Sequence, residues 1–181
     1  GGGGAMVVES LSGSDIEIID PGLSIKKIMQ DNNIVFNNNK LVDLTIAGTK
    51  PEIVNEVISQ MMKNENCDLV VMVVGSSAKF RPEQAVEPLL KWANYPKPLA
   101  VYVAPDAPEA LNLLHQNNIA CFRTPESCAE SVKIFLNTKN PVKQKILKND
   151  LSNISKKLKK NISKNLSEEE ALEIFKDIGI Q

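Results

Sequence analysis

Apolar residues in this chain recur in two alternating patterns. Short continuous apolar runs predict strands at Leu69–Val74, Pro98–Val103 and Ile119–Phe122. Each run precedes a segment with apolar residues every three or four positions, which predicts helices at Pro82–Trp92, Pro108–Gln116 and Pro125–Asn137. Strands alternating with helices at this spacing are typical of an α/β fold with a doubly wound parallel sheet. In such a fold, ligands bind at the carboxyl edge of the sheet.

The first part of the chain follows the same two patterns less regularly. Gly4–Ser12 predicts a short helix, and the alternation in Asp15–Ile19 and Leu41–Thr45 predicts two short strands. Two further helices are expected after Ser24 and Thr49, each of which is a plausible N-cap. The run Leu69–Val74 is rich in β-branched residues, which predicts a central strand covered on both faces.

The composition changes at Lys139. Residues 139–165 combine apolar positions at helical spacing with many lysines, which predicts a basic amphipathic linker after a first domain of residues 1–138. Ser167 and Glu170 then form a capping-box pattern. We interpret residues 166–181 as the start of a second, truncated domain.

Composition and charge narrow the function classes. Hydrophobic residues make up 43% of the chain and aromatic residues only 4%, so the core is expected to be aliphatic. A net charge of −1 gives no general attraction to nucleic acid or to a membrane, and the longest apolar run is too short to span a bilayer. The three cysteines have no metal-ligand spacing, which predicts no metal site and favours a reducing, cytoplasmic setting.

Two glycine-containing loops are candidates for binding an anion. The first is the run Gly1–Gly4 ahead of the opening helix, where the backbone N–H groups of Gly2, Gly3, Gly4 and Ala5 could approach a phosphate. The second is Gly75-Ser76-Ser77, which adds two hydroxyl donors after the strand Leu69–Val74. Both could lie on one edge of the sheet. The alternatives are two ordinary tight turns and, for the first loop, a remnant of cloning.

Other polar residues have supporting or structural interpretations. Asp43 could order the first loop by accepting its N–H groups, or could cap a turn. Lys79 and Arg81 follow the second loop and could support an anion, although a solvated helix start explains them as well. His115, the only histidine, is interpreted as a surface residue near a helix end. The cysteines Cys121 and Cys128 are interpreted as small buried residues, because neither has a basic partner in the sequence.

Several segments together resemble one family, the NDP-forming acyl-CoA synthetases of the acetate–CoA ligase (ADP-forming) group. Gly2 to Glu9 resembles the family's "SGGxGVLAAD" segment, and Leu41-Val42-Asp43-Leu44 resembles its "NPVDL". Ile119 to Glu126 resembles "GIPxYxTPE", and the segments from Leu166 and Gly179 resemble the start of the ATP-grasp domain. The motifs are individually weak, but their order and spacing agree over nearly the whole chain.

The resemblance implies a flavodoxin-like three-layer α/β/α domain with a helical C-terminal extension. It also implies a parent enzyme that interconverts acyl-CoA, ADP and phosphate with acid, CoA and ATP through a phosphohistidine. This chain would supply a helix N-terminus that holds the phosphohistidine, with Gly2, Gly3, Gly4, Ala5, Gly75, Ser76 and Ser77 as anion-binding residues and Asp43 in support.

The partners and cofactors follow from the same resemblance. The partners would be the CoA-binding, phosphohistidine and ATP-grasp domains, and a small anion such as phosphate or sulfate. CoA, ATP or ADP and Mg would be bound by the parent and not by this chain alone. The family's phosphohistidine motif is absent, so no catalytic residue is expected here. The alternative is a non-catalytic flavodoxin-like domain that binds an anion or regulates a partner.

Overall fold

The computed structural model describes residues 1–36, 40–138, 155–156, 159 and 165–177. The chain forms two compact units, Gly1–Thr138 and Lys139–Gln181. Most of the predicted basic linker, including residues 139–154, lies outside the described residues, as does the Gly179-Ile180 segment.

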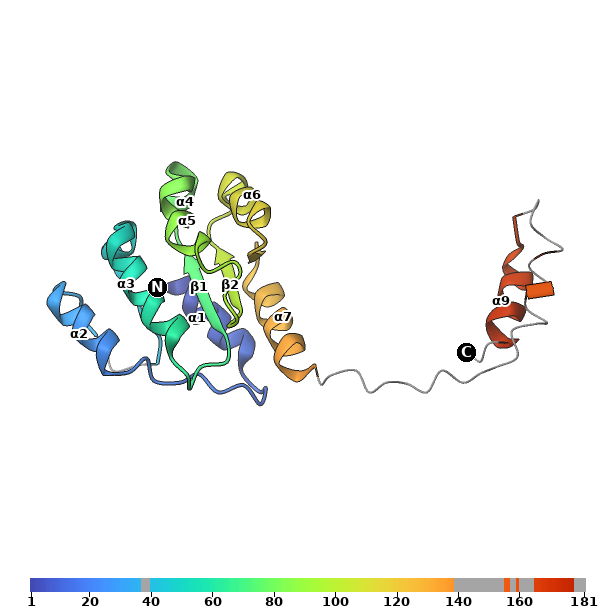
Figure 1. Ribbon diagram of the computed structural model, residues 1–181, viewed down its shortest axis with the longest axis horizontal. Coiled ribbons are helices and arrows are strands. Elements are labelled where there is room, and N and C mark those ends of the chain that lie inside the picture. Colours follow the sequence, from blue (N-terminus) through green and yellow to red (C-terminus); the bar gives the residue numbers. More distant parts are fainter. Residues whose placement is uncertain (37–39, 139–154, 157–158, 160–164, 178–181) are drawn as a thin grey trace. The chain divides into compact units, whose positions relative to one another are not determined.

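Three parallel strands form the sheet of the first unit (Figure 1). They are β1 (Val70–Val74), β2 (Leu99–Val103) and β3 (Ala120–Phe122), in that spatial order. With helices on both faces, this is the predicted flavodoxin-like doubly wound α/β fold. All five residues of β2 are buried, whereas the inner three of β1 are half-buried. The prediction that Leu69–Val74 is the central strand is therefore wrong, because β2 lies between the other two.

Successive residues of β2 pack into two different apolar layers, because side chains alternate across a sheet. Ala100 and Tyr102 join the cluster formed with α1 (Gly2–Leu11) and α7 (Pro125–Asn137). Val101 and Val103 join the cluster on the other face, which draws on α3 (Pro51–Lys63), α4 (Ser77–Phe80), α5 (Pro82–Leu90) and α6 (Pro108–Gln116). Helix α2 (Leu23–Asp31) packs on α3 in a third cluster.

Four of these helices begin with proline, which suits the first helical position because its N–H would have no intrahelical partner. Thr124 caps α7 as predicted, accepting a hydrogen bond from the N–H of Ser127 at 3.2 Å. The other two predicted caps are wrong. Gly22 and not Ser24 precedes α2, and Lys50 precedes α3, while Thr49 lies in a short 3₁₀ helix, Thr45–Thr49.

The two predicted N-terminal strands do not form. Asp15–Ile19 has no strand hydrogen bonding, although its three isoleucines are half-buried. Leu41–Thr45 has none either, since Val42 and Leu44 instead pack against the α2–α3 cluster as part of a loop. In both segments apolar side chains pack onto a core cluster, Ile16 onto that of α1 and α7 and Val42 and Leu44 onto that of α2 and α3, and no described strand pairs with them.

The second unit contains α9 (Glu168–Asp177), whose predicted capping box is present. The N–H of Ser167 donates to Oε2 of Glu170 at 2.9 Å, and the N–H of Glu170 donates to Oγ of Ser167 at 3.2 Å. This reciprocal pair satisfies two backbone donors that the helix itself leaves without partners.

Candidate functional site

The amino end of α1 lies at the carboxyl edge of the sheet. A Cβ on Gly3 would stand 2.9 Å from Cγ1 of Val73, 3.5 Å from Cε1 of Tyr102 and 3.7 Å from Cβ of Ala104. Val73 and Tyr102 are the second-last residues of β1 and β2, and Ala104 directly follows β2. Since Gly75-Ser76-Ser77 follows the last residue of β1, both predicted loops lie at this edge.

The opening glycines differ in their surroundings. Gly3 has no room for a side chain, because β-branched Val73 cannot easily move aside. Gly4 faces the side chain of Leu41, whose Cδ atoms would lie 3.2 and 3.3 Å from an added Cβ. Around Gly2 there is no atom within 4 Å. Close helix–sheet packing therefore explains Gly3, a role that the sequence analysis missed because Val73 is far away in the chain.

The first turn of α1 leaves two backbone donors available. The N–H groups of Gly4 and Ala5 both donate to the carbonyl of Gly1, at 3.0 and 3.3 Å. In the part of the chain that the structure describes, the N–H groups of Gly2 and Gly3 have no acceptor. Of the four residues predicted to offer N–H groups, Gly2 and Gly3 thus carry the available ones. The partial positive charge of a helix N-terminus adds to them.

Asp43 lies against the start of α1. Its Oδ2 is 2.6 Å from the amino group of Gly1, and its Oδ1 accepts from the N–H of Thr45 at 2.9 Å. These two hydrogen bonds, the one from Gly1 foremost, hold the pKa of the Asp43 carboxyl below its ordinary value of 3.8. The bond to Thr45 also supports an unusual backbone, because Thr45 is β-branched and has a φ of 50°. Both sequence interpretations of Asp43, loop support and turn cap, agree with this geometry.

The second loop is a tight turn that leads into α4. The carbonyls of Gly75 and Ser76 accept from the N–H groups of Ala78 and Lys79, each at 3.1 Å. Gly75 and Ser76 are exposed and Ser77 is half-buried. Lys79 and Arg81 are exposed on the chain that follows. Two hydroxyl groups and two positively charged side chains are therefore available near this end of β1 to bind an anion. Helix α4 is too short to add a substantial dipole.

The remaining candidate residues have structural roles. His115 is exposed in the last turn of α6, as predicted. Cys128 is fully buried, and burial raises the pKa of its thiol to about 11. Cys121 is half-buried, so the interpretation of it as a buried residue holds only in part, and this burial raises the pKa of its thiol. Raised pKa values disfavour the reactive thiolate form in both cases.

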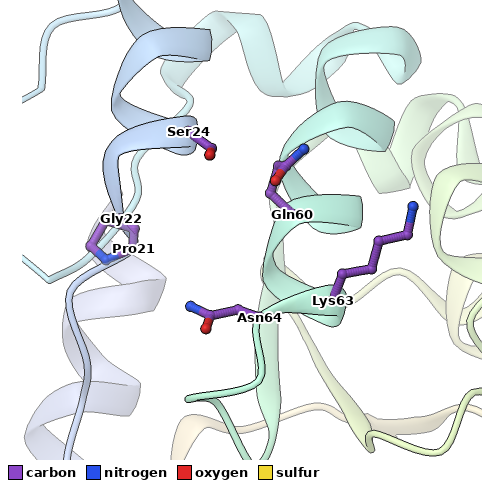
Figure 2. Close-up of a pocket in the computed structure, with 6 residues that line it drawn as sticks. All are labelled: Pro21, Gly22, Ser24, Gln60, Lys63 and Asn64. Atoms are coloured by element: carbon purple, nitrogen blue, oxygen red, sulfur yellow. The ribbon is translucent and has the colours of Figure 1, made fainter.

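A shallow hollow of about 240 Å³ lies between the start of α2 and the end of α3 (Figure 2). Its lining is mostly polar and comprises Pro21, Gly22, Ser24, Gln60, Lys63 and Asn64. The hollow lies beside the C-terminus of α3, from which the chain continues to the start of β1. It is therefore away from the amino end of α1. The sequence contained no motif for it, and Lys63 is the only charged side chain in its lining.

Two further properties concern the residues that the structure describes. Among them, no group of three or more His, Cys, Asp or Glu side chains could hold a metal ion. Within the same residues, no helix has the length and apolar character needed to cross a membrane.

Comparison with known proteins supports the fold. No protein-family model and no curated protein matches the chain. A solved structure that is similar is the crystal structure of PH0766 from Pyrococcus horikoshii OT3, with a TM-score of 0.58 and 20% sequence identity. The alignment covers 74% of this chain and 32% of that one, so the chain spans about a third of that protein's length. At this identity the likeness shows the fold alone.

Proposed function

We propose that this chain is the second flavodoxin-like domain, with its linker, of an NDP-forming acyl-CoA synthetase. In this proposal the amino end of α1 holds a phosphoryl group that a histidine on another domain carries. The parent enzyme would interconvert acyl-CoA, ADP and phosphate with acid, CoA and ATP. The order of the sequence motifs supports the proposed family. The available N–H donors at the start of α1 support the proposed binding of a phosphoryl group.

The observation that carries the proposal is the pair of N–H groups on Gly2 and Gly3. They have no acceptor among the described residues and lie at the carboxyl edge, where doubly wound sheets bind ligands. A phosphoryl oxygen can accept from such N–H groups, and the helix dipole favours its negative charge. The open space around Gly2 leaves room for the ligand.

The charges around this helix end are compatible with an anion. The carboxylate of Asp43 would repel one, but its two oxygens already accept hydrogen bonds from the backbone nitrogens of Gly1, at 2.6 Å, and Thr45, at 2.9 Å. Lys79 and Arg81, just past the second loop, add positive charge near the same edge. For an isolated phosphate at a solvent-exposed helix end, we expect a dissociation constant on the order of millimolar.

The reacting group has to come from outside this chain. His115 is exposed on the last turn of α6, and the family's phosphohistidine motif does not match it. This domain would therefore bind and orient the phosphoryl group and would pack on the domains that hold CoA and nucleotide. Incubated alone with acetyl-CoA, ADP, phosphate and Mg²⁺, the chain is expected to form no ATP, and clear turnover would contradict the assignment.

Chemical-shift mapping by NMR tests where an anion binds. The ¹⁵N-labelled chain is titrated with N-phosphorylated imidazole, as a mimic of phosphohistidine, and separately with inorganic phosphate. The proposal predicts the largest saturable amide shifts at Gly2 and Gly3, with smaller ones at Gly75-Ser76-Ser77, and a preference for the phosphorylated imidazole. Equal affinity for both ligands would favour a simple anion-binding module, and shifts confined to other residues would contradict both.

A further inference from the structure

The ring of Tyr102 lies beside the first turn of α1. Tyr102 is the second-last residue of β2, and its side chain belongs to the apolar layer formed with α1 and α7. Its Cε1 atom would be 3.5 Å from a Cβ on Gly3. Because Cε1 is bonded to the ring carbon that carries the hydroxyl group, the phenol end of the ring is the end that meets the start of the helix.

The hydroxyl group of Tyr102 has no hydrogen-bond partner in the part of the chain that the structure describes, although the residue is only 6% exposed. Among the described side chains, the only buried polar atom without a partner is Nε1 of Trp92. The hydroxyl oxygen of Tyr102 is therefore not enclosed, and solvent reaches it. Buried tyrosines generally give this group a partner. Packing in the apolar layer explains the ring but not the hydroxyl group, because a phenylalanine would fill the same space.

Two helices begin at the carboxyl edge on this face of the sheet. Helix α1 begins beside Tyr102, and α7 begins at the same edge because it follows directly from β3. The first turn of α7 is capped, since Thr124 accepts a hydrogen bond from the N–H of Ser127. No side chain caps α1, and among the described residues the N–H groups of Gly2 and Gly3 have no acceptor. The hydroxyl group of Tyr102 thus lies beside the helix start that has donors to offer.

We propose that Tyr102 is an anion-binding residue of the site at α1. Its hydroxyl group donates a hydrogen bond to the phosphoryl group that the N–H groups of Gly2 and Gly3 also bind. This inference rests on the proposed function, because the phosphoryl group is the ligand proposed there for α1. A phosphoryl group carries three acceptor oxygens, so it can accept from all three donors at once. The hydroxyl is neutral, and it therefore orients the group while the helix dipole favours its charge.

NMR of the tyrosine rings tests this contact without any substitution. The chain contains two tyrosines, Tyr95 and Tyr102, so labelling tyrosine with ¹³C at Cζ gives two signals, and Tyr95→Phe identifies them. During titration with N-phosphorylated imidazole, the signal of Tyr102 is expected to shift with the same dissociation constant as the amides of Gly2 and Gly3. The signal of Tyr95, which packs edge-on against Trp92, should stay unchanged. A Tyr102 signal that does not move while the two amides shift would overturn the proposal.

Removal of the hydroxyl group tests its contribution to binding. Tyr102→Phe keeps the ring in the apolar layer and should weaken the binding of N-phosphorylated imidazole about fivefold or more. Its urea-denaturation midpoint should equal that of the parent chain, because the hydroxyl has no partner among the described residues. The matched control is Tyr95→Phe, which removes a hydroxyl outside this site and should bind as the parent chain does.

The outcomes separate this inference from the proposed function. Equal affinities of Tyr102→Phe and the parent chain would overturn the role of Tyr102 and leave the proposed function standing. A parent chain in which the ligand does not shift the amides of Gly2 and Gly3 would contradict the proposed function, and this inference with it. If Tyr102→Phe fails to fold, the ¹³C titration of the parent chain still decides whether Tyr102 contacts the ligand.

Discussion

Gly3 and Val73 lie so close together that a Cβ on Gly3 would stand 2.9 Å from Cγ1 of Val73. This contact places the first turn of α1 directly on the carboxyl end of β1. The sequence alone could not show which of the glycines is needed for packing and which is free to bind an anion. Gly3 is required for packing, whereas Gly2, with open space around it, is where an anion could approach.

Alanine substitutions at these two glycines should differ in their effect on the free energy of unfolding. Gly3→Ala forces Val73 to shift in a packed layer, so we expect the free energy of unfolding to fall by about 1–3 kcal/mol. Gly2→Ala meets no atom within 4 Å and should leave stability unchanged or raise it by less than about 1 kcal/mol. Urea denaturation of both variants measures this difference. A similar loss in both would show that the contact with Val73 is not what constrains Gly3.

Asp43 should make stability depend on pH in the acid range. Its pKa is lowered in the folded state, so its contribution is fully present above its unfolded pKa of about 4 and is lost as the pH falls through the folded value. Its side chain is 45% exposed, so solvent screening limits the contribution to less than about 1 kcal/mol. Asp43→Asn should therefore be less stable than the parent chain at pH 7, with the difference shrinking below pH 4.

Thermal denaturation at several pH values measures this effect of Asp43. The control is Asp31→Asn, which changes an exposed carboxylate for which no ion pair exists among the described residues. A stability difference for Asp43→Asn that is the same at pH 3 and pH 7 would contradict the proposed ionic contact with Gly1.

The three cysteines should differ in reactivity. Cys128 is buried and its thiol has a pKa of about 11, so it should react with a thiol reagent at pH 8 only when the protein unfolds. Cys67 and Cys121 are half-buried and should react sooner. Mass spectrometry after timed labelling identifies each site, and Cys128→Ala provides the control that lacks the slow site. Early labelling of Cys128 in the folded chain would contradict its burial between α7 and the sheet.

Lys97 should stabilise the end of α3. Its Nζ donates to the carbonyls of Met61, at 3.3 Å, and of Asn64, where the helix leaves acceptors without intrahelical partners. Lys97→Met retains most of the apolar stem but removes these bonds, so we expect a loss of about 1–2 kcal/mol in the free energy of unfolding. Lys27→Met, on the exposed side of α2, is the control and should change stability little. Equal effects of the two substitutions would exclude a capping role.

Features that depend on neighbouring residues could be predicted from the sequence. The prolines that begin four helices, the Thr124 cap and the Ser167–Glu170 box all act within one helical turn. The parallel arrangement of β1, β2 and β3 could be predicted as well, because strand and helix patterns alternate regularly there. From the same alternation, the two candidate loops could be expected at one edge of the sheet, the carboxyl edge.

Features that depend on distant residues could not be predicted. Asp15–Ile19 alternates like a strand, but no described strand pairs with it, and its Ile16 packs on the cluster of α1 and α7. The order of the strands made β1 an edge, although its sequence is that of a buried central strand. Likewise, only the fold brings Val73 to Gly3 and Asp43 to Gly1.

Whether the N–H groups at the start of α1 hold a phosphoryl group can be measured at Gly2. Proline is tolerated at the first helical position, so Gly2→Pro removes one N–H with little effect on the helix, while Gly2→Ala keeps it. The affinity of each variant for N-phosphorylated imidazole is measured by NMR titration. We expect Gly2→Pro to weaken binding about fivefold or more, the equivalent of about 1 kcal/mol for one hydrogen bond, and Gly2→Ala to leave the affinity unchanged. Equal affinities of the two variants would contradict the proposed binding of a phosphoryl group.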